Sequence, residues 1–156
     1  MANVNIICIG KLKEKYLKEA QAEYTKRLSA FCRINVIEKK ESALPKNASS
    51  AEIDKAVMQE SSSLLQSSSG FKIALSPEGK TMSSESFADL IKTQSQKGDV
   101  SFFIGGSCGL SKDIKSQSNL MLSFSAMTMP HQLFRVVLLE QIYRAFMINN
   151  QRTYHK

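Results

Sequence analysis

The chain has 156 residues, of which 42% are hydrophobic and 22% are charged, and its formal net charge is +7. That length suits one domain with a buried core, so we expect residues 1–156 to form a single domain. No run approaches the roughly 18–20 apolar residues of a membrane helix, and no cleavable signal pattern opens the chain, which excludes a helical membrane span and predicts a cytoplasmic protein.

The first part of the chain predicts a strand, a helix and a second strand. Val4–Ile9 is an apolar run that ends at Gly10, as in a strand covered on both faces. Lys13–Phe31 places apolar residues three and four positions apart, the stripe of an amphipathic helix, and Arg33–Glu38 alternates like a strand. This order is typical of an α/β fold.

The middle of the chain continues this alternation. We expect a surface loop over 39–51, because it contains Pro45 and Asn47, and a turn at Ser76–Gly79. The other predicted elements are a helix over Ala51–Gln66, a strand at Phe71–Leu75, a helix that begins after Ser83 or Ser84 and runs through Gln94, a strand at Asp99–Ile104, one or two helical turns over Ser111–Ser118 and a strand at Leu120–Phe124.

Three of the seven glycines, Gly105, Gly106 and Gly109, directly follow the predicted strand at Asp99–Ile104. In open α/β sheets ligands bind at the carboxyl ends of strands, and glycine lets a ligand approach the backbone, so this glycine loop is the first candidate for a binding site. A tight turn without a ligand is the alternative. The spacing matches neither the dinucleotide fingerprint nor the phosphate-binding P-loop.

A second strand end is expected at the same pocket. Leu120–Phe124 is followed by the small, uncharged residues Ser125, Ala126 and Thr128, and no Lys or Arg lies between residues 98 and 111. Two uncharged strand ends at one edge of a parallel sheet predict a pocket for an uncharged or cationic ligand rather than for a phosphate.

The last predicted helix, His131–Ile148 after Pro130, is apolar around nearly its whole circumference. Packing against one layer needs only about a third of that surface, so either a partner subunit or the chain itself must cover the rest, and we expect a homodimer. Arg135 in the first turns is the better functional candidate. Glu140 and Arg144 are four residues apart, which predicts a structural ion pair.

Positive charge is concentrated near both ends of the chain, with nine basic and five acidic residues in 11–41 and four basic and one acidic in 131–156. This pattern predicts basic surfaces beside a neutral pocket and a polyanionic partner such as nucleic acid, with a merely solvated surface as the alternative. The ending Arg152–Lys156 could stack on a base and hold a phosphate, or it could simply fray.

The cysteines and histidines indicate no metal site. Cys8, Cys32 and Cys108 are interpreted as free thiols of a reducing compartment, and there is no C-x-x-C pair and only two histidines. Cys108 lies in the glycine loop, but a nucleophilic role would need an activating base, and no histidine or acidic residue stands beside it in the sequence.

Five ordered motifs resemble one known family. They are Ile-Ile-Cys-Ile-Gly-Lys-Leu-Lys near the start, Ile-Gly-Gly-x-x-Gly-Leu-Ser, Ser-x-x-Thr-x-Pro-His, Arg-Val-x-Leu-x-Glu-Gln-x-Tyr-Arg-Ala and the ending Tyr-His-Lys. From Val4 to Lys156 the chain resembles the bacterial ribosomal RNA large subunit methyltransferase H family. Its members use S-adenosylmethionine to methylate N3 of a pseudouridine in 23S rRNA.

The resemblance implies a three-layer α/β SPOUT fold, with a mostly parallel sheet, helices on both faces and a C-terminal trefoil knot. It also implies a homodimer whose active site draws on both subunits and which acts on the 23S rRNA of the ribosome, without a metal. The cofactor contacts that it implies are Leu75, Gly105, Phe124, Ser125, Ala126, Met127, Thr128 and Met129. Ser76 stands where many members carry an aspartate, which puts local cofactor contacts in doubt.

From these motifs we hypothesise that Arg135, Tyr154 and His155 position the acceptor base. The residues expected to contact RNA are Lys15, Lys18, His131, Arg152 and Lys156. Two other functions stay open: a non-catalytic RNA-binding or ribosome-assembly factor on the same fold, and a nucleotide-binding enzyme such as a flavodoxin-like protein.

Overall fold

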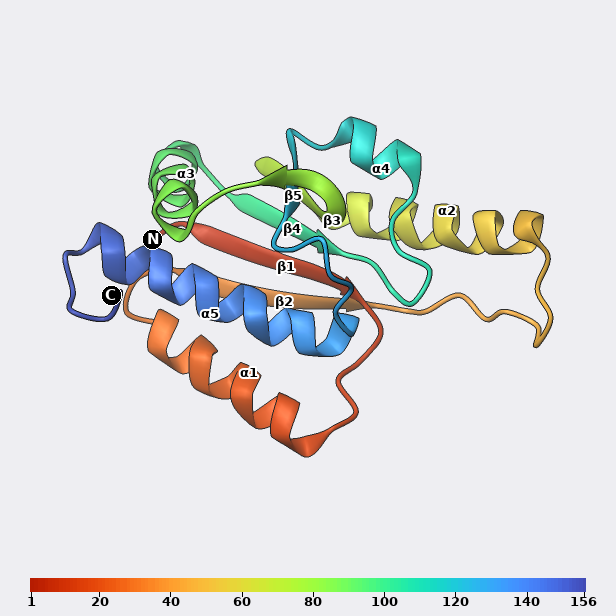
Figure 1. Ribbon diagram of the computed structural model, residues 1–156, viewed down its shortest axis with the longest axis horizontal. Helices are drawn as coiled ribbons and strands as arrows, with labels where there is room; N and C mark the ends of the chain where they lie inside the picture. Colours follow the sequence, from red (N-terminus) through yellow and green to blue (C-terminus); the bar gives the residue numbers. More distant parts are fainter.

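The computed structural model describes residues 1–156 and contains one five-stranded sheet in the order β2-β1-β4-β3-β5 (Figure 1). Every paired strand is parallel to its neighbour. The strands are β1 (Asn3–Ile9), β2 (Arg33–Lys39), β3 (Phe71–Thr81), β4 (Val100–Ile104) and β5 (Leu120–Ser123), and the helices are α1 (Lys15–Leu28), α2 (Ser50–Gln66), α3 (Ser84–Lys97), α4 (Lys112–Gln117) and α5 (His131–Asn149).

Helices cover both faces of this sheet, so the molecule has three layers. The helices α1, α3 and α5 lie on one face, and α2 and α4 lie on the other (Figure 1). Alternation along β1 explains the arrangement, because Ile6 and Cys8 enter the larger core beneath α5. Ile7 and Ile9 point the other way, toward Leu64 of α2. The predicted three-layer α/β fold with a parallel sheet is therefore confirmed.

The largest difference from the sequence-based expectation lies in β3. The strand is expected to end at Leu75, but it continues to Thr81. Leu75 and Lys80 both pair with Leu122, so the four residues between them leave the ladder as a bulge. The turn predicted at Ser76–Gly79 is this bulge, and β5 continues to pair with β3 beyond it.

The helix ends differ from the predictions by a few residues. α1 is shorter than the predicted Lys13–Phe31, since the amides of Phe31 and Cys32 both donate to the carbonyl oxygen of Leu28 and close the helix there. α3 begins at its Ser83 cap, as expected, but continues beyond Gln94 to Lys97. Pro130 is the N-cap of α5 rather than its first helical residue.

Polar side chains cross the sheet near the amino ends of three strands. The side-chain amide of Asn35 donates to Asn5 at 3.0 Å, and that of Asn5 donates to the Ser101 hydroxyl at 3.2 Å. Ser101 in turn donates to the carbonyl oxygen of Ser69 at 2.6 Å. Asn5 and Ser101 are buried, so these hydrogen bonds satisfy groups that would otherwise be costly inside the sheet.

α5 packs between α1 and α3 and buries only part of its apolar surface (Figure 1). Leu138, Leu139 and Ile142 are fully buried, whereas Leu133 remains 43% exposed and Phe134 is half-buried. The chain alone therefore leaves apolar surface uncovered at the start of this helix. No helix of the structure combines the length and the apolar character that crossing a membrane requires. The trefoil knot stays a prediction, because strand order does not test it.

Candidate functional site

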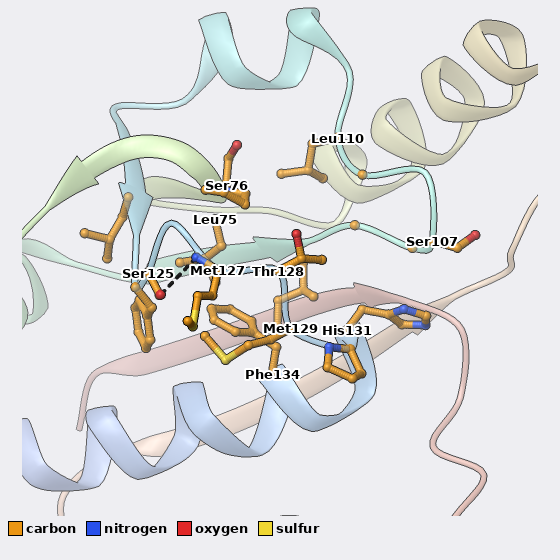
Figure 2. Close-up of a pocket in the computed structure, with 18 residues that line it drawn as sticks. Leu75, Ser76, Ser107, Leu110, Ser125, Met127, Thr128, Met129, His131 and Phe134 are labelled. Carbon is orange, nitrogen blue, oxygen red and sulfur yellow. Dashed lines mark hydrogen bonds between the residues drawn. The ribbon is translucent and has the colours of Figure 1, made fainter. Parts of the chain in front are cut away.

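A cavity of about 620 Å³ opens at the carboxyl ends of β4 and β5, beside the bulge in β3 (Figure 2). Three loops and the first turn of α5 form its walls. The lining residues are Leu75, Ser76, Pro77, Ile104, Gly105, Gly106, Ser107, Gly109, Leu110, Leu122, Phe124, Ser125, Met127, Thr128, Met129, Pro130, His131 and Phe134. Because the strands are parallel, their ends meet at one edge and bring these distant segments together.

The cavity wall carries no Lys, Arg, Asp or Glu side chain, and His131 is its one ionisable residue. Its polar groups are small hydroxyls and loop backbone, and its apolar groups include methionine and phenylalanine side chains. Such a wall offers little to a phosphate and much to an aromatic ring or a diffuse positive charge. The expectation of an uncharged pocket at two strand ends agrees with this geometry.

The glycine loop is both a tight turn and a cavity wall. The amide of Gly109 donates to the carbonyl oxygen of Gly106 at 3.0 Å, and Gly109 adopts a φ of +79°. A Cβ on Gly105 would lie 2.6 Å from backbone atoms of Gly109, so a larger residue would force the turn apart. The loop is therefore a tight turn that also forms part of the cavity wall, and ligand binding there stays a prediction.

The loop after β5 is held in shape by its own serine residues. Ser123 donates its hydroxyl to the Ser125 carbonyl oxygen at 3.0 Å. The Ser125 hydroxyl accepts from the amide of Met127 at 3.0 Å (Figure 2). Behind the loop, Phe124 meets Phe134 edge to face with ring centroids 5.1 Å apart. Met127 is 79% exposed, so one edge of the cavity faces solvent.

Most of the cofactor-binding residues implied by the resemblance line this cavity. Ala126 is the exception, because it lies in the same loop without contributing to the wall. The others are Leu75, Gly105, Phe124, Ser125, Met127, Thr128 and Met129. The lining residues not expected from the sequence include Pro77, Leu110 and Phe134. The sequence offered one indication of them, their position close to a predicted strand end or helix start.

Arg135 lies outside the cavity and is 1% exposed. Its guanidinium donates to Glu38 at 2.7 Å and to the Gly10 carbonyl oxygen at 3.1 Å, and it reaches Gln21 at 3.4 Å. The structure therefore places it beneath α5, where it joins that helix to β1, β2 and α1. A polar residue in the first turns of a helix can face a site or can be buried beneath the helix. The sequence does not distinguish the two, so the burial of Arg135 could not be predicted.

The C-terminal tail, residues 150–156, folds back on its own chain, far from the cavity. The Tyr154 hydroxyl donates to Glu140 at 2.9 Å, and the His155 ring lies 3.1 Å from Arg144 and 2.6 Å from Glu85. Glu140 also binds Arg144 at 3.0 Å, which confirms the predicted ion pair.

Burial, followed by the hydrogen bond to Glu140, raises the pKa of Tyr154 to about 12. The phenol therefore keeps its proton at neutral pH and can donate a hydrogen bond, but it cannot serve as a base.

The predicted RNA-contacting residues fall at two ends of the molecule. Lys15 and Lys18 are exposed on the first turns of α1, and the amide of Lys13 donates to Gln132 beside the cavity at 3.1 Å. His131 lies in the cavity wall itself. Arg152 and Lys156 belong to the distant tail and are exposed. Within one chain, only Lys15, Lys18 and His131 therefore lie at the same end of the molecule as the cavity.

The cysteines show two different environments. Cys8 and Cys32 are buried, and burial raises their pKa values to about 11 and about 12, so both thiols stay protonated and unreactive at neutral pH. Cys108 is exposed at the tip of the glycine loop, and its one polar side-chain neighbour is the Ser107 hydroxyl at 3.9 Å. No activating base therefore stands beside it.

The comparisons with known proteins point to one family. The family model described as "Predicted SPOUT methyltransferase" matches residues 2–155. A protein of Leuconostoc mesenteroides named ribosomal RNA large subunit methyltransferase H is 48% identical over 159 residues, covering 99% of each chain. A Clostridium botulinum protein of the same name is also 48% identical, over 158 residues and 99% of each chain.

Similarity to solved structures supports the fold. A methylase family protein from Neisseria gonorrhoeae superimposes with a TM-score of 0.52 at 13% identity, covering 99% of this chain and 87% of that one. A methylase family protein from Haemophilus influenzae gives a TM-score of 0.53 at 12% identity, covering 96% of this chain and 67% of that one.

Proposed function

The chain belongs to the SPOUT methyltransferase family, and from that premise we propose that it methylates large-subunit ribosomal RNA with S-adenosylmethionine, at N3 of a pseudouridine in 23S rRNA. The observation that carries the proposal is the cavity without Lys, Arg, Asp or Glu at the ends of β4 and β5 and the bulge of β3. Relatives that are 48% identical along their whole length bear the name of a ribosomal RNA large subunit methyltransferase.

The cavity suits this methyl donor in size and character. Its volume of about 620 Å³ is typical of small-molecule sites. Phe124, Met127 and Met129 offer apolar surface for an adenine ring, while the backbone around Gly105 offers hydrogen-bonding groups at close range. No Lys or Arg in the wall would repel the cationic sulfur.

When bound, S-adenosylmethionine supplies a methyl group on a positively charged sulfur, which is already a good leaving group. The chain's task is therefore mainly to place the acceptor nitrogen in line and to manage its proton. Tyr154 keeps its proton, since its pKa is about 12, and its ring can position the acceptor base while its hydroxyl donates to Glu140. His155, whose ring nitrogens contact Arg144 and Glu85, would position the acceptor base beside it.

We propose a homodimer in which the tail of one subunit completes the cavity of the other. α5 has 19 residues and spans about 27 Å, so Tyr154 and His155 cannot reach the cavity of their own chain from the position they occupy. The exposed Leu133 and Met127 beside the cavity supply apolar surface that a partner subunit would cover.

The same arrangement suggests how RNA is held. In such a dimer the basic tail of one subunit, with Arg152 and Lys156, would lie near Lys15, Lys18 and the cavity of its partner. These cations would bind the phosphate backbone, and the uncharged cavity would receive the flipped base. We propose the assembled ribosome in the cytoplasm as the substrate.

Calorimetry with S-adenosylmethionine tests the cofactor, and mass mapping of rRNA from a deletion strain tests the product. We expect binding by the wild-type protein, at least tenfold weaker binding by Gly105→Ala because of its backbone clash, and one methylated pseudouridine missing from the deletion strain. RNA affinity without donor binding would instead support a non-catalytic assembly factor.

Hybrid dimers test the shared site. Gly105→Ala disables the cavity and His155→Ala disables the tail, so each homodimer should be nearly inactive. Equal mixing with random reassociation should restore activity to about a quarter of the wild-type sites, because half of the dimers are hybrids and each has one intact site. Mixtures that stay as inactive as the separate variants would contradict the composite site.

A further inference from the structure

Glu60 is a buried carboxylate directly behind the cavity wall. It belongs to α2 and is 6% exposed. One oxygen, Oε2, accepts from the amide of Ser42 at 2.8 Å. The other, Oε1, lies 3.7 Å from the position that a Cβ on Gly106 would take. Gly106 lines the cavity, so this carboxylate lies behind the glycine loop, beside the Ile9 side chain.

The position of Glu60 is fixed from both sides. The hydroxyl of its neighbour Ser61 accepts from the amide of Ser111 at 3.0 Å, which ties α2 to the far end of the glycine loop. The hydrogen bond from Ser42 ties the carboxylate to the connection between β2 and α2. A charge held this firmly acts on the cavity from one fixed direction.

A carboxylate here needs a reason, since an apolar side chain would fill the same space at lower cost. Burial raises the pKa of Glu60, and the nearby Glu41 raises it further. The Ser42 amide and His131 act in the opposite direction and favour the charged form. The pKa of Glu60 is therefore raised overall, and the Ser42 amide and His131 limit that rise.

No other acidic side chain has comparable access to the cavity, whose one ionisable wall residue is His131. The wall itself contains no Asp, Glu, Lys or Arg. Glu78 follows the lining residue Pro77, but its side chain is 75% exposed and is paired with Lys115 at 3.3 Å. Solvent and the paired ammonium screen Glu78, whereas the buried Glu60 is screened much less.

We propose that Glu60 is a specificity-determining residue, whose negative charge behind the glycine loop makes the cavity prefer the positively charged sulfonium donor over the neutral thioether product, S-adenosylhomocysteine. This inference rests on the proposed methyltransferase function. Its consequence is that the attraction from Glu60 disappears once the methyl group has left, which favours release of the product.

Glu60→Gln tests the proposal, because it keeps the shape of the side chain and removes its charge. Calorimetry at about pH 8 gives the dissociation constants of S-adenosylmethionine and S-adenosylhomocysteine for each protein. A buried unit charge about 10 Å away is worth roughly tenfold in affinity. We expect Glu60→Gln to weaken donor binding by about tenfold and to change product binding by less than about twofold.

Three further variants separate charge from structure. Glu60→Asp keeps the charge and should keep the wild-type ratio of the two affinities. Asp54→Asn removes an exposed charge from the same helix and should alter neither affinity. Glu60→Met removes the charge without burying an amide, and it should reproduce the ratio of Glu60→Gln if that variant does not fold.

An equal loss of both ligands in the uncharged variants would show a purely structural role and overturn the inference, leaving the proposed function intact. A wild-type protein that binds neither ligand would instead overturn the proposed function.

Discussion

At the scale of single residues, Arg135 shows how burial changes an assignment. Its guanidinium lies outside the cavity, bound by Glu38 and by the carbonyl oxygen of Gly10. Its Nε is buried without a hydrogen-bond partner, so the hydrogen-bonding capacity of the guanidinium is not fully satisfied. The contacts to β1 and β2 fix the start of α5, and with it His131 and Phe134 in the cavity wall.

We therefore expect Arg135→Met to lower the free energy of unfolding by about 2–3 kcal/mol, since it leaves Glu38 partly buried without its partner. Lys15→Met is the control, because the Lys15–Glu19 pair is exposed and should contribute less than about 0.5 kcal/mol. Urea denaturation measures both. If Arg135→Met kept full stability but lost single-turnover methylation, the hypothesis of a catalytic Arg135 would be revived.

Tyr154 gives a prediction for pH. Its pKa is raised to about 12 in the folded chain, from an unfolded value near 10, so the folded state holds the phenolic proton more tightly. The stability that this contributes is fully present below pH 10 and is lost as the pH rises from about 10 to about 12.

The stability difference between wild type and Tyr154→Phe should therefore shrink over that interval and stay constant between about pH 7 and 9. Denaturant titrations at a series of pH values measure it. A difference that varied across neutral pH would mean that another group, such as the neighbouring Glu140, is responsible.

At the scale of elements, the bulge in β3 shapes one wall of the cavity. Ser76 and Pro77 reach the cavity because the bulge leaves the ladder, and pairing with β5 resumes at Lys80. This return depends on Gly79, where a Cβ would lie 2.7 Å from the Leu122 backbone nitrogen. The neighbouring strand cannot move away, because Leu122 is itself buried.

Gly79→Ala should therefore lower the free energy of unfolding by at least about 2 kcal/mol and also weaken donor binding. Lys80→Ala, one residue further along the same strand, should change stability by less than about 0.5 kcal/mol, since its side chain is exposed. Chemical denaturation and calorimetry give the two readouts. Equal effects of the two substitutions would refute the role assigned to the bulge.

Local patterns predicted the elements well, and non-local contacts account for the rest. Helical and strand periodicity placed all five strands and all five helices, and every boundary except the end of β3 lies within three residues of its predicted position. The sheet order β2-β1-β4-β3-β5 brings together segments far apart in sequence, which no periodicity reveals. The same holds for the continuation of β3 to Thr81, which exists only because β5 offers a partner.

The candidate site divides in the same way. The glycine loop and the segment after β5 could be identified because each follows an apolar strand, and Leu75 came from the resemblance. The side of α5 on which Arg135 lies could not be predicted, because the start of that helix has one side that is buried and another that faces the site. Tyr154 and His155 are docked by Glu140 and Arg144 of α5 and by Glu85 of α3. The sequence of a polar tail does not predict such contacts.

At the scale of the whole molecule, net charge gives a prediction for RNA binding. The chain carries a formal charge of +7, and Lys15 and Lys18 lie on the face of the sheet that also carries α5. Affinity for rRNA should fall steeply with salt, and replacing both lysines with alanine should reduce the slope of log affinity against log salt by about 1.5. Filter binding at several salt concentrations measures it.

Lys55→Ala is the matched control, because Lys55 is exposed on α2, on the opposite face of the sheet. Its slope should equal that of the wild type. A slope that changed equally in both variants would mean that RNA contacts the protein without regard to face, and the proposed binding surface would have to be abandoned.

The polar hydrogen bonds across the amino ends of β2, β1 and β4 have a consequence at the other end of the sheet. Sliding one strand by two residues would keep every apolar side chain on its proper face, so hydrophobic alternation alone tolerates that error. The slide would, however, separate Asn5 from Asn35 and Ser101 and leave the buried side-chain amide of Asn5 without hydrogen-bond partners. The network therefore fixes the register of these strands. The same register sets the relative positions of the cavity loops at the other end of the sheet.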